Sequence, residues 1–234
     1  MGGYAFPYID SYYIILVIPT ILLSFLGQIW VKSTFNRYSK IKIQSSMLGV
    51  DVAKKVLDTA DVSNVNIERT GGFLTDHFDP RRMVLRLSEA VYGSSSISAA
   101  GVAAHEAGHA VQKKRKYIPL VLRSTLVPVA NIGSTVGPYL ALFGIILSNK
   151  YFLKAGIVLF AASVLFYIIT LPVEFNASRR ALRFLRESGI LESSEIRKVR
   201  KVLTAAAFTY VAAALTQLAS LVRLILIAKS RDRS

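Results

Sequence analysis

The sequence HEAGH, at residues 105–109, holds two of the three histidines of this 234-residue chain. His105 and His109 are four positions apart, so on a helix both imidazoles project from one face, about 40° from each other. Neutral imidazoles bind Zn²⁺, whereas Glu106 lies too far round the helix to be a ligand and can take a proton from the attacking water. The alternative is a chance match between ordinary histidines. This spacing is rare by chance, so we predict a hydrolytic metal site.

A catalytic zinc site has three protein ligands and one position for water, so a third ligand is needed. The chain has no cysteine, which excludes thiolate ligands. His77 is the only other histidine, but it could be a substrate contact or a polar surface residue. Glu174 directly follows an apolar segment, where a carboxylate is costly unless it pairs or ligates. We expect Glu174 to be the third ligand; the alternative is a surface glutamate paired with Arg179 or Arg180.

Long apolar segments surround these residues in the sequence. The chain is 53% hydrophobic, which is too apolar for an ordinary soluble protein. Four runs contain no Asp, Glu, Lys or Arg, and each is long enough to cross a hydrocarbon core, which takes about 20 helical residues. These runs are residues 11–31, 125–147, 155–173 and 202–222. The sequence therefore predicts a multi-pass membrane protein with four transmembrane helices in contact with the lipid bilayer.

Two polar segments, residues 32–124 and 174–201, lie between these runs. Two crossings separate the two segments, so both are expected on the same side of the membrane. They carry 15 and 8 of the 29 Lys and Arg residues, and the positive-inside rule therefore predicts that both are cytoplasmic. The net charge of +15 is explained by this distribution and by nearby anionic headgroups. We therefore expect no nucleic-acid partner.

The first polar segment predicts an α+β arrangement around the histidines. Residues 45–60 place apolar side chains on one helical face. The alternating sequence after them predicts two or three short strands, with a turn at Asp79–Pro80. A further helix is expected to begin among Ser94–Ser98 and to run through HEAGH to about Lys114. Residues 1–234 would then form a single membrane domain, in which four transmembrane helices carry a short sheet and the metal-binding helix.

These motifs resemble those of a known family. HEAGH and EFNAS, with LTDHFDPRRMVLRLSE before them and four crossings around them, are similar to the bacterial neutral membrane zinc metallopeptidases and, more widely, to gluzincin membrane proteases. The resemblance covers nearly the whole chain. It implies a zincin-like domain that cleaves peptide bonds, with one Zn²⁺ bound by His105, His109 and Glu174 and with Glu106 as general base. The wider pattern has Asp where this chain has Ser178, which changes the hydrogen bonding around the ligands.

The strand-like stretch before the metal-binding helix is a candidate substrate site, because a sheet edge borders the cleft in the proteases that this chain resembles. Residues Gly72–His77 and Arg82–Leu87 are expected to pair as a hairpin near the zinc. An extended peptide could add to its edge through backbone hydrogen bonds. We therefore take Leu74, Thr75 and His77 as candidate substrate-binding residues. The alternative is that the hairpin only covers the helix, since LTDHFDP could be a plain turn.

Two other functions fit parts of the sequence. A catalytically idle, zinc-binding membrane scaffold or chaperone would keep the metal, but a structural site has no use for the acid at Glu106. A transporter-like bundle is suggested by the prolines and small residues of the second apolar run. Small residues at this spacing are more often helix-packing surfaces, which favours a peptidase over a transporter.

Overall fold

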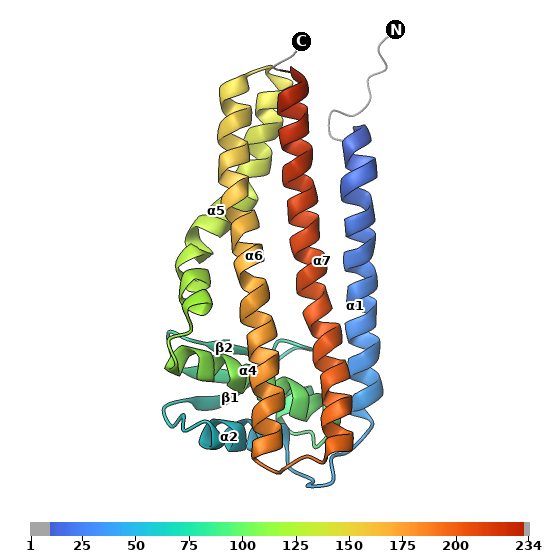
Figure 1. Ribbon diagram of the computed structural model, residues 1–234, viewed down its shortest axis with the longest axis vertical. Coiled ribbons are helices and arrows are strands. Elements are labelled where there is room, and N and C mark those ends of the chain that lie inside the picture. The colour runs from blue at the N-terminus through green and yellow to red at the C-terminus, as the bar shows by residue number, and fades with distance from the viewer. Residues whose placement is uncertain (1–9, 232–234) are drawn as a thin grey trace. The chain divides into compact units, whose positions relative to one another are not determined.

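Figure 1 shows the computed structural model, which describes residues 10–231. The described chain is mostly helical and contains one small sheet. In chain order its elements are the π-helical turn η1 (Tyr13–Val17), α1 (Ile18–Ser39), α2 (Gly49–Thr59), β1 (Asn66–Thr70), β2 (His77–Asp79), β3 (Val84–Ser88), α3 (Glu89–Tyr92), α4 (Ile97–Lys114), α5 (Ile118–Ile146), α6 (Lys150–Glu187) and α7 (Ser193–Arg231). All three strands therefore lie within the first polar segment of the sequence.

Four helical segments are long and apolar enough to cross a membrane. They are Tyr13–Ser39, Ile118–Ile146, Lys150–Glu187 and Ser193–Ser230. Each overlaps one of the four charge-free runs and extends beyond it, because the flanking polar residues continue the same helix. Within residues 10–231, the structure therefore has four candidate membrane-spanning helices at the places where the sequence predicts them.

The chain forms two compact units. The membrane unit, as we name it, comprises residues 122–171 with the described parts of residues 1–27 and 209–234. The site unit comprises residues 28–121 and 172–208. All the predicted ligands and the predicted base belong to the site unit. That the chain acts as one membrane domain stays a prediction.

The site unit contains a three-stranded sheet of order β1-β3-β2. The central strand β3 pairs in parallel with β1 and in antiparallel with β2. Leu85 and Leu87 of β3 are completely buried, as predicted, but Val84 and Ser88 are buried as well, because β3 is the central strand of the sheet. Helix α4 packs against β2 and β3 as well as against α2 and α3 (Figure 1). The sheet, α2 and α4 therefore share one hydrophobic core, which fixes the helix that carries HEAGH.

Strand β2 lies later in the chain than the sequence predicts, at His77–Asp79 in place of Gly72–His77. It begins only at His77, so the prediction of a strand from Gly72 onward is wrong up to that residue. Gly72 and Leu74 adopt left-handed backbone conformations, with φ of 96° and 56°, and such residues do not continue a β-ladder. The Thr75 hydroxyl donates a hydrogen bond to the Gly71 carbonyl at 2.8 Å. Leu74 and Thr75 therefore lie in a compact loop before β2, and only β2 and β3 form the hairpin.

Helix α4 begins and ends as the sequence predicts. Ser96 is its N-cap, and the Ser96 hydroxyl oxygen accepts a hydrogen bond from the N–H of Ala99 at 3.2 Å. Lys113 and Lys114 lie in the last turn, where positive charge is favourable. Most of the helix is buried, and its buried residues are largely alanines and glycines. Such small side chains allow neighbouring elements to approach the helix backbone closely.

In the membrane unit, α5 and α6 also pack through glycine. A Cβ atom at Gly133 would collide with the Leu159 carbonyl, and one at Gly137 would lie 2.8 Å from the Phe160 backbone nitrogen. Only glycine therefore allows this close approach. The contacts support helix packing as the role of the small residues in α5, in preference to the transporter interpretation.

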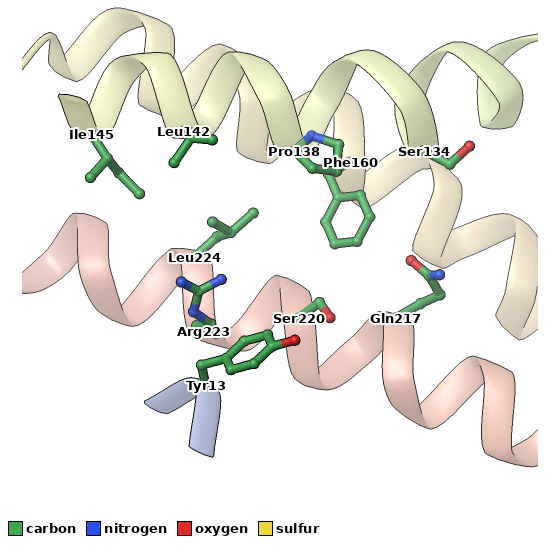
Figure 2. Close-up of a pocket in the computed structure, with 10 residues that line it drawn as sticks. All are labelled: Tyr13, Ser134, Pro138, Leu142, Ile145, Phe160, Gln217, Ser220, Arg223 and Leu224. Carbon is green, nitrogen blue, oxygen red and sulfur yellow. The ribbon is translucent and has the colours of Figure 1, made fainter. Parts of the chain in front are cut away.

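The membrane unit also contains a cavity of about 210 Å³ that both polar and apolar side chains line (Figure 2). Gln217 and Arg223 of α7 line it together with Tyr13 of η1 and Ser134 of α5. One Arg223 Nη atom lies 2.8 Å from a carboxylate oxygen of Asp10, and the guanidinium carbon lies 5.1 Å from the centroid of the Tyr13 ring. A charge in a membrane-spanning helix is costly without such a partner. The ion pair explains how α7 accommodates an arginine beside its apolar run.

Candidate metal centre

The helices that carry the predicted ligands approach each other closely in the site unit. His105 and His109 lie on α4, and Glu174 lies on the part of α6 that belongs to the same unit. A Cβ atom added to Gly108 would lie 2.7 Å from the carbonyl oxygen of Ala177. A larger residue would force the two backbones apart. The glycine of HEAGH therefore brings both histidines within reach of Glu174.

The side chains of these three residues converge on one point. His105 Nε2 lies 3.2 Å and His109 Nε2 lies 3.5 Å from the same carboxylate oxygen of Glu174. The three potential ligand atoms lie within 4.8 Å of one another, and no other such group of His, Asp or Glu occurs among residues 10–231. Glu174 is only 2% exposed, so it is not the surface glutamate of the alternative interpretation. The three residues could hold a metal ion.

The spacing of the donor atoms suits zinc. Two ligands that each lie about 2.0–2.1 Å from a tetrahedral ion are about 3.3–3.4 Å apart. The separations of 3.2 and 3.5 Å lie on either side of this value. Two imidazoles and one carboxylate also form a ligand set typical of a catalytic zinc site, which leaves one position for water. The chemistry of the three donors and the two separations from Glu174 therefore fit a zinc ion.

A buried glutamine orients one of the two imidazoles. The Gln112 side-chain N–H₂ group donates to the Val173 carbonyl at 2.8 Å and to the Asn176 side-chain oxygen at 3.0 Å. The Gln112 side-chain oxygen is then the acceptor 3.0 Å from His109 Nδ1. His109 must carry its proton on Nδ1, which leaves a lone pair on Nε2 for a metal. Gln112 was not among the residues predicted from the sequence, although its position three residues after His109 on one helix could have indicated it.

Ser178 takes the corresponding position beside His105. The Ser178 hydroxyl oxygen lies 3.1 Å from His105 Nδ1 and can accept a hydrogen bond from the Nδ1–H, while Nε2 faces Glu174. Serine therefore supplies the hydrogen bond at the position where the wider protease pattern has aspartate. Because serine is neutral, it makes the imidazole a weaker electron donor than aspartate would.

We expect the substitution Ser178→Ala to lower zinc affinity by about 10–100-fold, because the ring of His105 loses its orienting partner. Competition with a zinc chelator of known affinity would measure the change. Ser178→Asp should retain or increase the affinity. Ser188→Ala is a matched control, since the Ser188 hydroxyl bonds only the Leu185 carbonyl. Unchanged zinc affinity in Ser178→Ala would show that this hydrogen bond has no role in metal binding.

Glu106 lies beside the three potential ligands and is also buried, with 8% exposed. Burial, together with the nearby carboxylates of Glu174 and Asp76, raises the pKa of Glu106 to about 7, although His105 and a hydrogen bond from the backbone N–H of Phe78 lower it. A carboxyl group with a pKa near neutral pH can both accept and return a proton. The position of Glu106 therefore suits acid–base chemistry.

Asp76 connects the loop before β2 to the end of β3. One carboxylate oxygen of Asp76 accepts a hydrogen bond from the N–H of Ser88 at 2.7 Å, and the other accepts one from the Ser88 hydroxyl at 2.9 Å. Burial raises the pKa of Asp76 above its ordinary value. Asp76 was not predicted from the sequence, because a lone aspartate in a turn-like stretch gives no signal for a buried contact.

The predicted substrate-binding residues lie outside the cluster of potential ligands. His77 Nδ1 lies 2.8 Å from the Thr75 carbonyl oxygen, and the other ring nitrogen lies 3.4 Å from an Arg86 nitrogen. Leu74 is exposed in the preceding loop. However, β2 is an edge strand of the sheet. The backbone N–H of its residue Phe78 is close enough to Glu106 to lower the pKa of that carboxyl group. The edge of the sheet therefore borders the site, and substrate binding by these residues stays a prediction.

The fold and the candidate centre define a class of protein: a membrane protein with four candidate transmembrane helices and a helix that carries two histidines and a glutamate in metalloprotease spacing. The chain belongs to the family described as "Putative neutral zinc metallopeptidase", which matches residues 13–229. It is 47% identical over 215 residues to the "Putative membrane protease YugP" of Bacillus subtilis (strain 168). The aligned residues make up 92% of this chain and 96% of that protein. No solved structure matches the chain. The predicted membership of the neutral zinc metallopeptidase family is therefore confirmed.

Proposed function

We propose that this protein is a zinc metalloendopeptidase that hydrolyses peptide bonds in membrane or unfolded proteins. One observation carries the proposal: the side chains of His105, His109 and Glu174 converge within 4.8 Å, beside a buried Glu106, in a chain of a zinc metallopeptidase family. A helix with both histidines, a sheet edge beside it and a glutamate from a later helix also support a zincin-like site of the gluzincin type.

The residues divide the chemistry among them. His105, His109 and Glu174 would hold one Zn²⁺, which supplies Lewis acidity and lowers the pKa of a water toward about 7. The Glu106 carboxylate accepts a proton from the attacking water and later delivers it to the nitrogen of the leaving amine. The hydrogen bonds of Gln112 and Ser178 hold the imidazoles in place while this proton moves.

The substrate class follows from the edge of the sheet. β2 is an edge strand of the sheet, and an extended peptide can pair with such a strand through its backbone, with little dependence on side chains. Leu74, Thr75 and His77 lie in or just before this strand and are the proposed contacts. We infer that residues 32–124 and 174–201 are cytoplasmic, since they carry most of the positive charge. Unfolded or membrane-tethered chains that reach the cytoplasmic face would be the substrates.

Purified protein and a fluorescently labelled, unfolded protein substrate would test the proposal. We expect the zinc-loaded protein to generate new amino termini, identified by mass spectrometry, and we expect a chelator to stop cleavage until zinc is returned. Cleavage that persists after the metal has been removed would contradict the proposal. Full zinc occupancy without cleavage of any peptide would instead favour the idle scaffold or chaperone.

A further inference from the structure

A second cavity, of about 310 Å³, lies in the site unit and is separate from the candidate metal centre. We call it the basic pocket. Two helices line it: α1 contributes Trp30, Thr34, Arg37 and Tyr38, and α7 contributes Arg200, Lys201 and Thr204. None of these residues belongs to the group that could hold a metal. Peptide hydrolysis gives no reason for a cavity of this composition.

The charges around the basic pocket are all positive. Arg37, Arg200 and Lys201 line it, and no Asp or Glu does. Within residues 10–231, none of these three cations forms an ion pair with a carboxylate; Arg37 instead lies over the Tyr38 ring, 5.8 Å from its centroid. Three cations around one cavity repel one another unless an anion lies among them. The pocket is therefore complementary to an anionic group.

The sequences of both helices change character at the basic pocket. In α1 the charge-free run of residues 11–31 ends just after Trp30, and in α7 the charge-free run of residues 202–222 begins just after Lys201. The pocket therefore lies at the depth where the hydrocarbon core of a bilayer meets the headgroups. Tryptophan is enriched at this depth.

The apolar side of the basic pocket is open. Trp30 is 43% exposed, and the neighbouring Ile29 is 50% exposed. The Trp30 ring contacts Phe208 of α7 edge-on, with centroids 5.3 Å apart. A ligand with an anionic head among the cations could therefore extend an apolar chain along exposed Trp30 and Ile29. A free inorganic anion would leave this surface uncovered.

We propose that the basic pocket binds an anionic phospholipid. Its phosphodiester lies among Arg37, Arg200 and Lys201, with the hydroxyls of Thr34 and Thr204 as further donors, and its acyl chains lie beside Trp30 and Ile29. The cations supply the electrostatic preference for an anionic headgroup, as basic pockets between transmembrane helices do elsewhere. The proposal depends on the membrane location of the chain and is independent of peptidase activity.

Trp30 is the only tryptophan of the chain, so its fluorescence reports on the basic pocket alone. The full-length protein would be reconstituted in vesicles that contain phosphatidylglycerol or phosphatidylcholine with brominated acyl chains, since bromine quenches tryptophan at short range. We expect brominated phosphatidylglycerol to quench Trp30 several-fold more effectively than brominated phosphatidylcholine at the same mole fraction. Equal quenching by the two lipids would overturn the proposal.

The double variant Arg200→Gln/Lys201→Gln tests which residues give the preference. Both side chains are exposed, so the fold should be retained, and we expect the preference for phosphatidylglycerol to be lost, because each cation contributes about fivefold to the affinity for an anionic headgroup. Lys54→Gln/Lys55→Gln is the matched control, because it removes the same charge from exposed positions on α2. A preference that survives in Arg200→Gln/Lys201→Gln would refute the assignment.

Inorganic phosphate distinguishes a lipid site from a general anion site. Because the acyl chains contribute to binding, millimolar phosphate should leave the quenching by brominated phosphatidylglycerol in place. Complete release of the quenching by phosphate, at constant ionic strength, would show that the pocket takes free anions in preference to lipid.

Discussion

The variant Glu106→Gln is expected to hydrolyse peptides about 10²–10⁴-fold more slowly than the unchanged protein while it still binds zinc. Glutamine keeps the size and polarity of the side chain but cannot accept a proton from water. Glu106 is not among the three residues whose potential ligand atoms converge, so the metal should remain. Initial rates of peptide cleavage and the zinc content of the same sample would measure the two effects separately.

Glu89→Gln is a suitable control for this experiment. Glu89 is exposed on α3 and lies 3.9 Å from Arg69, so its substitution changes the charge equally without a change near the site. Normal turnover in Glu106→Gln would exclude Glu106 as the general base. If cells that carry Glu106→Gln grow like cells with the unchanged protein although cleavage is abolished, the scaffold or chaperone interpretation is favoured. Only a catalytic role requires the acid at this position.

Much of the candidate site could be predicted because its signals are local. His105 and His109 lie one helical turn apart, and the small residues around them predict a buried helix. Glu174 could be predicted from its position next to an apolar run, where an isolated carboxylate is costly. The four long helices followed from the absence of charge over the length of a membrane crossing.

The contacts that orient the site could not be predicted in the same way, because they depend on the approach of two helices distant in sequence. Ser178 lies beside His105, 73 residues away, only because Gly108 allows the α4 backbone to approach Ala177. The start of β2 was predicted wrongly for a related reason. Gly72 takes a left-handed conformation, which residue alternation does not reveal.

The variants His105→Ala, His109→Ala and Glu174→Gln are each expected to lose more than about 100-fold in zinc affinity, since the loss of an outer hydrogen-bond partner alone costs about 10–100-fold. Each change removes one of the three converging donor atoms. For Glu174→Gln the loss also includes a negative charge that faces the cation. Zinc content after dialysis against a mild chelator would measure the effect, and peptidase activity should fall in parallel.

His77→Ala is the matched control, because it removes the remaining histidine of the chain from a position outside the cluster. It should retain one zinc per chain, whatever its effect on substrate binding. Circular dichroism should show unchanged helix content in all four variants, since the core around α4 is formed by apolar residues. Full zinc occupancy in Glu174→Gln under the same conditions would contradict ligation by Glu174. A different third ligand would then be required, because two histidines alone do not complete a catalytic zinc site.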